Sequence, residues 1–403
     1  MIESICDSFD SRCTGCEACM RACPRSCIEM VPDKEGFAYP SIDNFLCISC
    51  EACVRACPNN MDVRYEDSAC AWAFQEQGDF ALRSSSGGAF HALGLDVLAR
   101  GGVAYGFAFN GCDLVMRRAD KAADLDKLRG SKYVQGSIGD SFDQIERDAV
   151  LGLPIVVCGT ACQIAGIRSS LSALRDKVLL IDLVCHGVPS PAMFERHVRY
   201  LEKRFEDDLI EYSFRDKKTT HWLMSKHFRY RFARRDDVEG NWKADAYYNA
   251  YLKALTMREC CYRCPYSTVA RCSDLTLCDF WGVDRASRSI DQRLGVSAFI
   301  AHTDRGRAAA ERLEAYGVMH KIEVDDILKG NPNLERPTNR PAARDEVYAD
   351  ISRTGYEAWA VRQVTLKDRI FAFVVDSVPL CAVESLQKLR DRKRARSERV
   401  ERR

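Results

Sequence analysis

Two stretches, Cys13-Thr-Gly-Cys-Glu-Ala-Cys-Met-Arg-Ala-Cys-Pro24 and Cys47-Ile-Ser-Cys-Glu-Ala-Cys-Val-Arg-Ala-Cys-Pro58, repeat one pattern of cysteines. Each reads C-x2-C-x2-C-x3-C-P, in which three thiolates bind one 4Fe–4S cubane and the fourth binds the other. The two-residue gaps let three thiolates fold around one face of a cubane. We therefore predict two 4Fe–4S clusters, one held by Cys13, Cys16, Cys19 and Cys57 and the other by Cys47, Cys50, Cys53 and Cys23.

The segment between the two runs predicts a small fold built on the clusters. Residues 27–31 and 36–40 are short apolar pieces, which favours a hairpin. The duplicated run is rare outside ferredoxins, so it favours clusters over structural zinc, which also takes four thiolates per site. We expect an α+β ferredoxin-like dicluster module over residues 1–66. Cysteines outside both runs are interpreted as small buried thiols: Cys6, Cys27 and Cys70.

Composition limits the class of protein. The 403 residues exceed one small domain, and 59 basic against 58 acidic residues argue against a nucleic-acid binder. Residues 1–20 lack the apolar core of a signal peptide, and residues 370–375 are too few to span a bilayer. We expect a cytoplasmic protein, in which the 21 cysteines remain reduced and clustered ones serve as metal ligands or redox groups.

From about residue 80 the pattern changes to helices that alternate with buried strands. Helices are predicted over residues 89–100 and 161–171, and another begins at Pro191, a residue suited to a first helical turn. Apolar runs that read as buried strands are residues 103–109, 154–158 and 178–184. The alternation predicts an α/β domain with a largely parallel sheet over residues 80–350.

Two turns in this domain lie directly ahead of helices, Ser86-Gly87-Gly88 and Gly159-Thr160. Such α/β sheets bind ligands at the carboxyl ends of their strands, where helix N-terminal amides suit a phosphate. An ordinary tight turn is the alternative for each. Neither a G-x-G-x-x-G after a strand nor a G-x-x-x-x-G-K-[ST] occurs, which disfavours a standard dinucleotide fold and a P-loop.

Cys261-Tyr-Arg-Cys264 is a C-x2-C pair, and a pair is half a metal site. Cys162 and Cys185 lie at predicted strand ends, where they could complete it. The spacing favours a third cluster and leaves rival ligands open, namely Cys260, Cys272 and Cys278.

Five motifs follow one another between residues 80 and 300. They are Ser86-Gly87-Gly88, Leu128-Arg-Gly-Ser-Lys-Tyr-Val-Gln135, Gly159-Thr-Ala-Cys-Gln163, Val184-Cys-His-Gly-Val-Pro-Ser190 and Ser273-Asp-Leu-Thr-Leu-Cys-Asp-Phe-Trp281. In this order they resemble the coenzyme F420 hydrogenase/dehydrogenase beta-subunit family. Proteins of this family bind FAD and a 4Fe–4S cluster, and include subunits that reduce a deazaflavin coenzyme. A plant relative reduces the hydroxymethyl group of a chlorophyll.

The resemblance implies roles for individual residues. The family's cysteine positions, and with them the third cluster, fall on Cys162, Cys185, Cys261 and Cys264. Lys132 suits a pyrophosphate or the negative charge of a reduced flavin, whereas a solvated lysine would be the default without the motif. Contacts with FAD are expected from Ser86, Gly87, Gly88, Gly130, Ser131, Lys132, Tyr133, Gly159 and Thr160.

Three positions depart from the family pattern. Cys278 stands where a small residue is usual, and Cys272 where proline or valine is common. These extra cysteines bear on the ligand set of the third cluster. Ala161 replaces a usual proline, which removes a rigid turn and leaves Cys162 in place.

The resemblance implies an FAD-dependent iron–sulfur oxidoreductase. Clusters exchange single electrons and FAD delivers two to a small organic acceptor, the deazaflavin coenzyme F420 or another ring substrate. A non-catalytic electron-transfer subunit of a larger redox complex is the alternative. We expect ferredoxin or another redox protein as the partner, and a homo-oligomer is left open. No catalytic residue is assigned, since His186 beside Cys185 reads better as structural than as a proton donor.

The C-terminal residues 351–403 predict a helical segment with a basic tail. From residue 387 to the end, nine residues are basic and three are acidic. A solvated end is favoured over a docking surface for an acidic partner.

Overall fold

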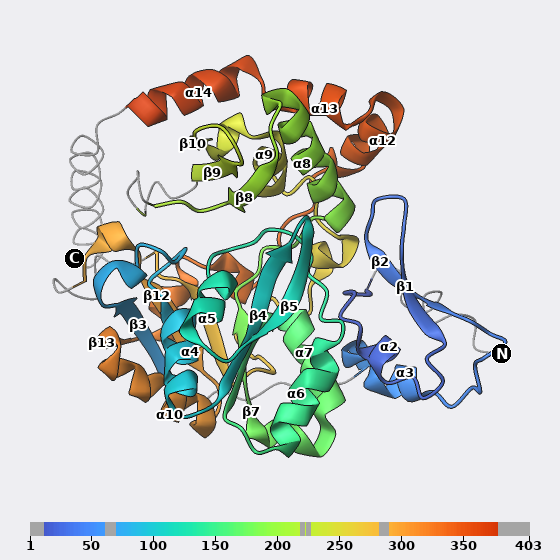
Figure 1. Cartoon of the computed structure of the whole chain (residues 1–403), viewed down its shortest axis with the longest axis vertical. Coiled ribbons are helices and arrows are strands. Elements are labelled where there is room, and N and C mark those ends of the chain that lie inside the picture. Colours follow the sequence, from blue (N-terminus) through green and yellow to red (C-terminus); the bar gives the residue numbers. More distant parts are fainter. Residues whose placement is uncertain (1–11, 61–69, 218–221, 223–226, 282–289, 378–403) are drawn as a thin grey trace, which may run out of the picture.

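The computed structural model describes residues 12–60, 70–217, 222, 227–281 and 290–377. Figure 1 shows three parts: a small module at one side, a large sheet in the centre, and a helical part along one edge of that sheet. Cys6 and the basic tail beyond residue 377 lie outside the described residues. Among the helices that the structure describes, none has the length and apolar character needed to cross a bilayer.

The small module repeats one local backbone geometry. In both cysteine runs the chain is left-handed at the same two positions, Gly15 and Glu17 in the first and Ser49 and Glu51 in the second, with φ between 53° and 66°. These turns curl the chain before a short helix, α2 (Ala18–Arg21) or α3 (Ala52–Ala56). The predicted hairpin is confirmed as antiparallel strands β1 (Ile28–Pro32) and β2 (Ala38–Ile42). A short turn, η1 (Pro58–Asn60), closes the module.

The large sheet has eight strands in the order β13-β3-β12-β11-β7-β6-β4-β5. Its central strands are parallel. They are the three predicted ones, β4 (Val103–Asn110), β6 (Ile155–Thr160) and β7 (Val178–Leu183), and a fourth that was not predicted, β11 (Leu275–Asp279). The outer pairings are antiparallel and bring in β3 (Cys70–Glu76), β5 (Asp113–Ala119), β12 (Ser297–Ala301) and β13 (Gly317–Ile322). The predicted parallel arrangement therefore holds for the centre of the sheet, and the sheet as a whole is mixed.

Helices cover both faces of this sheet. The predicted helices are present as α4 (Ala89–Ala99) and α7 (Ala161–Leu171). On one face, α4, α5 (Ala122–Leu128) and α10 (Asp304–Glu311) pack on apolar side chains that include Phe74, Val156 and Phe299. On the other face, α6 (Ser141–Val150) and α7 pack on Val103, Val157 and Leu180, among others. Because strand residues alternate between faces, adjacent residues such as Val156 and Val157 serve opposite cores.

The helical part has an aromatic core that the sequence did not predict. A three-stranded sheet, β8 (Leu209–Ser213), β9 (His227–Phe232) and β10 (Val238–Asn241), packs with α8 (Pro191–Phe205) and α9 (Ala246–Leu252). Pro191 opens α8 as predicted, behind the N-cap Ser190. Three C-terminal helices continue this part: α12 (Arg344–Thr354), α13 (Tyr356–Gln363) and α14 (Leu366–Ser377). Shorter elements along the sheet are α11 (Val324–Leu328) and the turn η6 (Glu259–Arg263).

Candidate functional site

The first group of module cysteines gathers on the side of the module that faces the sheet. Burial and the neighbouring thiols of Cys162, Cys57 and Cys13 raise the pKa of Cys16 to about 12. Burial and the thiols of Cys16, Cys13 and Cys57 likewise raise the pKa of Cys19. A small cavity is lined by all four cysteines predicted to share one cluster, Cys13, Cys16, Cys19 and Cys57.

The second group lies further from the sheet. The pKa of the Cys53 thiol is raised by burial and by the nearby Cys23 and Cys47. Cys50 is exposed, so this group reaches the surface of the protein. Cys27 is buried beside it, as predicted for a thiol outside the runs, and its Sγ lies 3.3 Å from Cys23 Sγ. That hydrogen bond is the main reason that the pKa of Cys27 rises to about 11.

The four cysteines assigned to a third cluster come together from three separate segments. Burial, followed by the thiols of Cys264, Cys185 and Cys261, raises the pKa of Cys162. Burial and the thiols of Cys261 and Cys264 raise the pKa of Cys185 to about 12. Cys162 lies in the first turn of α7, directly after β6, and Cys185 follows the end of β7. Cys261 lies in the turn η6, and Cys264 directly follows it. Two groups already contact these sulfurs, since Gly187 N–H lies 3.3 Å from Cys185 Sγ and Thr160 Oγ1 lies 3.3 Å from Cys162 Sγ.

Each of the three cysteine groups offers four thiols, the donors that structural zinc and a 4Fe–4S cubane both take. Within the ranges that the structure describes, no three His, Cys, Asp or Glu side chains converge closely enough to hold a single metal ion. Structural zinc draws four ligands to about 2.0–2.3 Å from one centre. A cubane spreads its four thiolate ligands around four irons, so four thiols also meet the needs of a 4Fe–4S cluster.

The first module group and the third group meet across helix α7. Cys162 and Gly166 are four residues apart, so they share one face of this helix. A Cβ added to Gly166 would lie 3.0 Å from both Cβ and Sγ of Cys16. A side chain at this position would require Cys16 to shift by a few tenths of an ångström. Cys16 therefore contacts α7 at Gly166, about one helical turn after Cys162.

Arg258 holds the module against the large domain. The side chain is fully buried, and its guanidinium donates to the carbonyls of Cys13 at 2.8 Å and Ala38 at 3.0 Å. It also donates to Gln135 Oε1 at 3.1 Å and lies 4.0 Å from the ring centroid of Tyr39. The module carbonyls thus depend on a cation from the segment that precedes Cys261.

Further bonds join the module to the domain. Glu17 accepts the backbone N–H of Ile138 at 2.9 Å and of Gly139 at 2.7 Å. Arg344 pairs with Glu35, with N···O distances of 2.5 and 2.6 Å. The module is therefore held by contacts spread over its whole inner face.

A cavity of about 310 Å³ lies at the carboxyl ends of β6 and β7. Ligand cavities in proteins typically span about 300–1,000 Å³. Its walls include the four cysteines of the third group, so thiols and loops face one space. They also include eight of the nine residues predicted to contact FAD: Ser86, Gly88, Gly130, Ser131, Lys132, Tyr133, Gly159 and Thr160. Gly87 lies in the same turn, its amide 2.9 Å from Ser297 Oγ.

The amides of both predicted phosphate turns already have partners. The amide of Ala89, the first residue of α4, points to Ser297 Oγ at 3.5 Å, and the carboxylate of Glu76 lies against Gly88. At α7, the side chain of Gln163 accepts the amide of Thr160 at 3.1 Å. The turns therefore shape the wall of the cavity more than they offer free donors.

Lys132 also differs from its predicted role in detail. Its ammonium donates to the carbonyls of Leu128, Arg129 and Gly130 at 3.3, 2.7 and 3.2 Å, where it caps the C-terminus of α5. Burial lowers the pKa of Lys132 to about 8. An anion in the cavity would raise the pKa of Lys132 again, because it stabilises the charged ammonium. The positive charge of Lys132 therefore suits an anionic cofactor.

Sequence reasoning missed the buried cation behind the first turn. Lys217 donates to the carbonyls of Ala81 at 2.7 Å, Ser86 at 2.7 Å and Leu294 at 2.5 Å. Burial lowers its pKa to about 7. Lys217 follows Arg215-Asp216 and belongs to no sequence motif. Its contacts with three backbone carbonyls therefore could not be predicted from the sequence.

Of the rival cysteines, Cys260 and Cys278 line the same cavity as the third group, whereas Cys272 is not among its lining residues. Cys278 lies on β11, where its thiol contacts the carbonyl of Ala298 at 3.7 Å. Burial followed by the charge of Asp182 raises the pKa of Cys272 to about 12. Cys260 stays close, because its hydrogen bond is the largest cause of the raised pKa of Cys261. His186 is exposed at the rim of the cavity.

Two parts of the chain match models of known protein families. Residues 153–327 match the family model for the C-terminal part of the coenzyme F420 hydrogenase/dehydrogenase beta subunit. Residues 12–61 match the model of a 4Fe–4S dicluster domain. A chain from the F420-reducing NiFe hydrogenase complex of Methanosarcina barkeri is similar at 15% identity and a TM-score of 0.43, over 72% of this chain and 94% of that chain. No curated protein matches the sequence.

Proposed function

We propose that this chain is an FAD-dependent iron–sulfur oxidoreductase, since residues 153–327 match the coenzyme F420 hydrogenase/dehydrogenase beta-subunit family and residues 12–61 match a 4Fe–4S dicluster domain. The chain would pass electrons between a ferredoxin-like donor and a small organic acceptor, the deazaflavin coenzyme F420 or another ring substrate. The observation that carries the proposal is the shared cavity, which four cysteines and the predicted cofactor loops line together.

The residues of the chain divide the work in a simple way. When bound, the clusters supply one-electron exchange and FAD supplies exchange with a two-electron acceptor. Cys162, Cys185, Cys261 and Cys264 would hold the third cluster at one end of the cavity. The cationic side of the cavity, including Lys132, would balance the negative charge of the cofactor. Gly166 keeps Cys16 close to α7 and so places the module beside this end.

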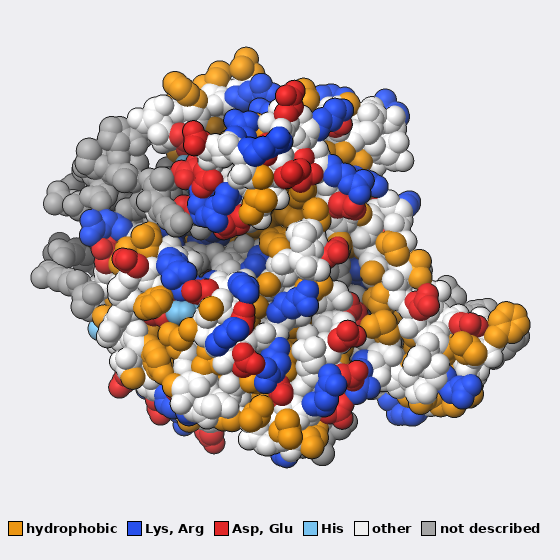
Figure 2. All heavy atoms as spheres, viewed as in Figure 1, with side chains coloured by type: hydrophobic (Ala, Val, Ile, Leu, Met, Phe, Trp, Pro, Cys, Tyr) orange, Lys and Arg blue, Asp and Glu red, His pale blue; other side chains and the backbone are white. Residues whose placement is uncertain are grey.

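The outer end of the module offers a surface for the electron donor. Phe45 is fully exposed, and Leu46 and Ile48 on either side of Cys47 are exposed by 46% and 59%. Figure 2 shows hydrophobic side chains gathered at this end of the molecule. Exposed apolar side chains around a cluster ligand suit a small redox protein, because contact there excludes water and brings two clusters close. We propose that residues 45–48 dock a ferredoxin-like donor.

The proposal is tested with the whole chain, purified without oxygen. Reduced ferredoxin should bleach a flavin absorbance band in the wild-type protein, and coenzyme F420 or a related ring acceptor should restore it. The variant Cys185→Ser should keep the dicluster signals and lose the coupling to flavin. If the flavin of this variant is reduced by ferredoxin as fast as in the wild type, the third cysteine group does not connect donor and cofactor.

A further inference from the structure

Cys27 belongs to neither cysteine run, yet its thiol lies in contact with a predicted cluster ligand. Its Sγ is 3.3 Å from Cys23 Sγ. Cys23 ends the first run and is predicted to bind the second cluster together with Cys47, Cys50 and Cys53. The module therefore holds a fifth thiol directly beside one of these four ligands.

A tight turn brings the two sulfurs together. The amide of Ser26 donates to the carbonyl of Cys23 at 3.2 Å, and Ser26 is left-handed, with φ at 48°. Residues other than glycine adopt this conformation uncommonly, so the surrounding structure must hold the turn in place. Cys27 comes next, and its carbonyl accepts the amide of Asp43 at 2.8 Å, beside the first pair of the β1–β2 hairpin. The backbone is thus fixed on both sides of the contact.

The two thiols differ in their access to solvent. Cys27 is 5% exposed and packs with Ile28 in the core of the module, whereas Cys23 is half-buried. Cys50, from the same predicted ligand set, is exposed, so solvent reaches this group. A dissolved oxidant would therefore meet Cys23 before Cys27. An accessible cysteine next to a second cysteine that can resolve its oxidised form is typical of redox-sensitive sites.

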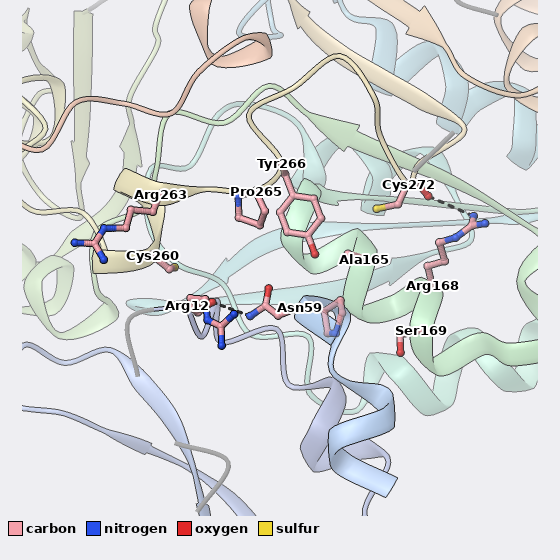
Figure 3. Close-up of a pocket in the computed structure, with 11 residues that line it drawn as sticks. Arg12, Asn59, Ala165, Arg168, Ser169, Cys260, Arg263, Pro265, Tyr266 and Cys272 are labelled. Atoms are coloured by element: carbon pink, nitrogen blue, oxygen red, sulfur yellow. Dashed lines mark hydrogen bonds between the residues drawn. The ribbon is translucent and has the colours of Figure 1, made fainter. Parts of the chain in front are cut away.

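The second run differs at the matching position. It ends at Cys57, and four residues later the sequence has Met61 in place of a cysteine. The chain after Cys57 packs on helix α7, where Ser169 donates to the carbonyl of Ala56 at 2.7 Å. Figure 3 shows Asn59 beside this helix, with its side chain directed to Arg12. The extra thiol is therefore particular to the cluster that Cys23 is predicted to bind.

We propose that Cys23 and Cys27 form a reversible disulfide in a chain that lacks the second cluster. With hydrogen peroxide as the oxidant, the thiolate of Cys23 attacks one oxygen, the O–O bond breaks, and a sulfenic acid and hydroxide result. Cys27 gives its proton to the hydroxide, and its sulfur attacks the sulfenic sulfur. The S–S bond forms as the S–O bond breaks. Two thiols and one peroxide thus yield one disulfide and two waters, and two electrons pass from sulfur to oxygen.

The disulfide would both block and protect the ligand. Cys23 cannot bind iron while it is paired, so the second cluster is rebuilt only after a dithiol has reduced the bond by exchange. Without Cys27, the sulfenic acid on Cys23 is open to further oxidation to a sulfinic acid, which thiols do not reverse. Formation of the disulfide depends on the dicluster module alone. Its effect on electron entry from ferredoxin rests on the proposed function.

The test uses the whole chain, treated with hydrogen peroxide in the presence of an iron chelator. The chain is then denatured with N-ethylmaleimide, which blocks free thiols, and digested with trypsin. Cleavage after Arg25 places Cys23 in the peptide of residues 22–25 and Cys27 in that of residues 26–34. Mass spectrometry should find these two peptides joined in most chains and separated by dithiothreitol. Two separate, blocked peptides, or Cys23 joined to another cysteine, would overturn the proposal whether or not the chain binds FAD.

A variant tests the protective role. After peroxide, dithiothreitol and reconstitution with iron and sulfide, Cys27→Ala should regain roughly half as much of the second cluster as the wild type, or less, because Cys23 is overoxidised. The control Cys112→Ser changes a half-buried cysteine between β4 and β5 and should recover as the wild type does. Equal recovery in both variants would contradict protection by Cys27. A loss of about four irons from Cys27→Ala before any peroxide would make Cys27 a cluster ligand and overturn the proposal.

Discussion

The dicluster module and the cavity of the large domain gather their cysteines in opposite ways. In the module, each run of twelve residues brings three thiols together through two left-handed turns and one short helix. At the cavity, Cys162, Cys185 and the pair at 261–264 meet only because a parallel sheet places two strand ends beside the turn η6. The module depends on local backbone geometry, whereas the cavity depends on the whole fold. Substitutions should therefore affect the two regions separately, except where contacts such as Arg258 join them.

The largest effect should come from removing one thiol of the third group. Cys261→Ser should lower the iron content from about twelve to about eight atoms, since each cubane holds four irons. The dicluster signals in electron paramagnetic resonance should remain. The matched control is Cys278→Ser, a half-buried cysteine on β11 that lines the same cavity and whose thiol donates to the carbonyl of Ala298. It should keep all the iron, and loss of four irons in this control instead would place Cys278 in the ligand set.

Arg258→Met should weaken the contact between the dicluster module and the large domain. The change leaves the carbonyls of Cys13 and Ala38 buried without their donor. Leaving buried polar groups unpaired costs about 1–3 kcal/mol each, so a loss of roughly 2–6 kcal/mol in the free energy of unfolding is expected for the two carbonyls. Urea unfolding followed by cluster absorbance measures it. Arg258→Lys keeps the charge but not the planar fork, and should recover only part of the loss.

Gly166→Leu tests the contact across α7. The added side chain meets Cys16, which should cost roughly 1–3 kcal/mol through overpacking. Reduction of the third cluster by ferredoxin should slow, while both regions keep their iron. Gly166→Ala, which adds one carbon, should give a smaller effect in stopped-flow measurements. Identical rates for the two variants and the wild type would show that electrons do not cross at this helix.

Lys132→Met should reduce retention of FAD about tenfold near neutral pH and leave the iron content unchanged, because one positive charge leaves the cavity wall. The pKa of Lys132 is lowered to about 8 by burial, so its ammonium is charged below that pH and loses its proton above it. The difference between the lysine and methionine proteins should therefore shrink as the pH rises through about 8. Equilibrium dialysis at several pH values measures it. A tenfold difference that persists at high pH would mean that the side chain acts through packing alone.

The smallest effect is expected at the outer end of the module. Phe45→Ser should raise the KM for ferredoxin roughly threefold to tenfold without changing kcat, because an exposed aromatic anchor is lost. Phe373→Ser changes another exposed phenylalanine, on α14, and is the control. Equal KM values in both variants would remove residues 45–48 as the docking surface.

The same contrast explains how much could be predicted from the sequence. The module was predictable because its ligands repeat within short runs, and the hairpin between them follows from Pro32 and Gly36. The central strands were found because β6 and β7 are continuous apolar runs. The strand β3 was missed, since the domain was expected to begin at residue 80, whereas β3 begins at Cys70.

Other parts had weaker signals or none. Strand β9 alternates Phe228, Tyr230 and Phe232 with arginines, a two-residue period that would have revealed it. The four cysteines of the third group are spread over about a hundred residues. Their spacing therefore could not identify them as one set of ligands, and only the resemblance to a known family indicated it. Arg258 and Lys217 carry no motif, because what defines them is burial among carbonyls of distant segments.

We propose that one cavity of this chain holds a third cluster beside FAD. Iron, zinc and released flavin should be measured in the full chain purified without oxygen. We expect about twelve irons and one FAD per chain, the flavin identified by mass after denaturation, and no zinc. Eight irons without flavin would restrict the cofactors to the dicluster module, and stoichiometric zinc in place of iron would exclude the clusters; either result would overturn the proposal.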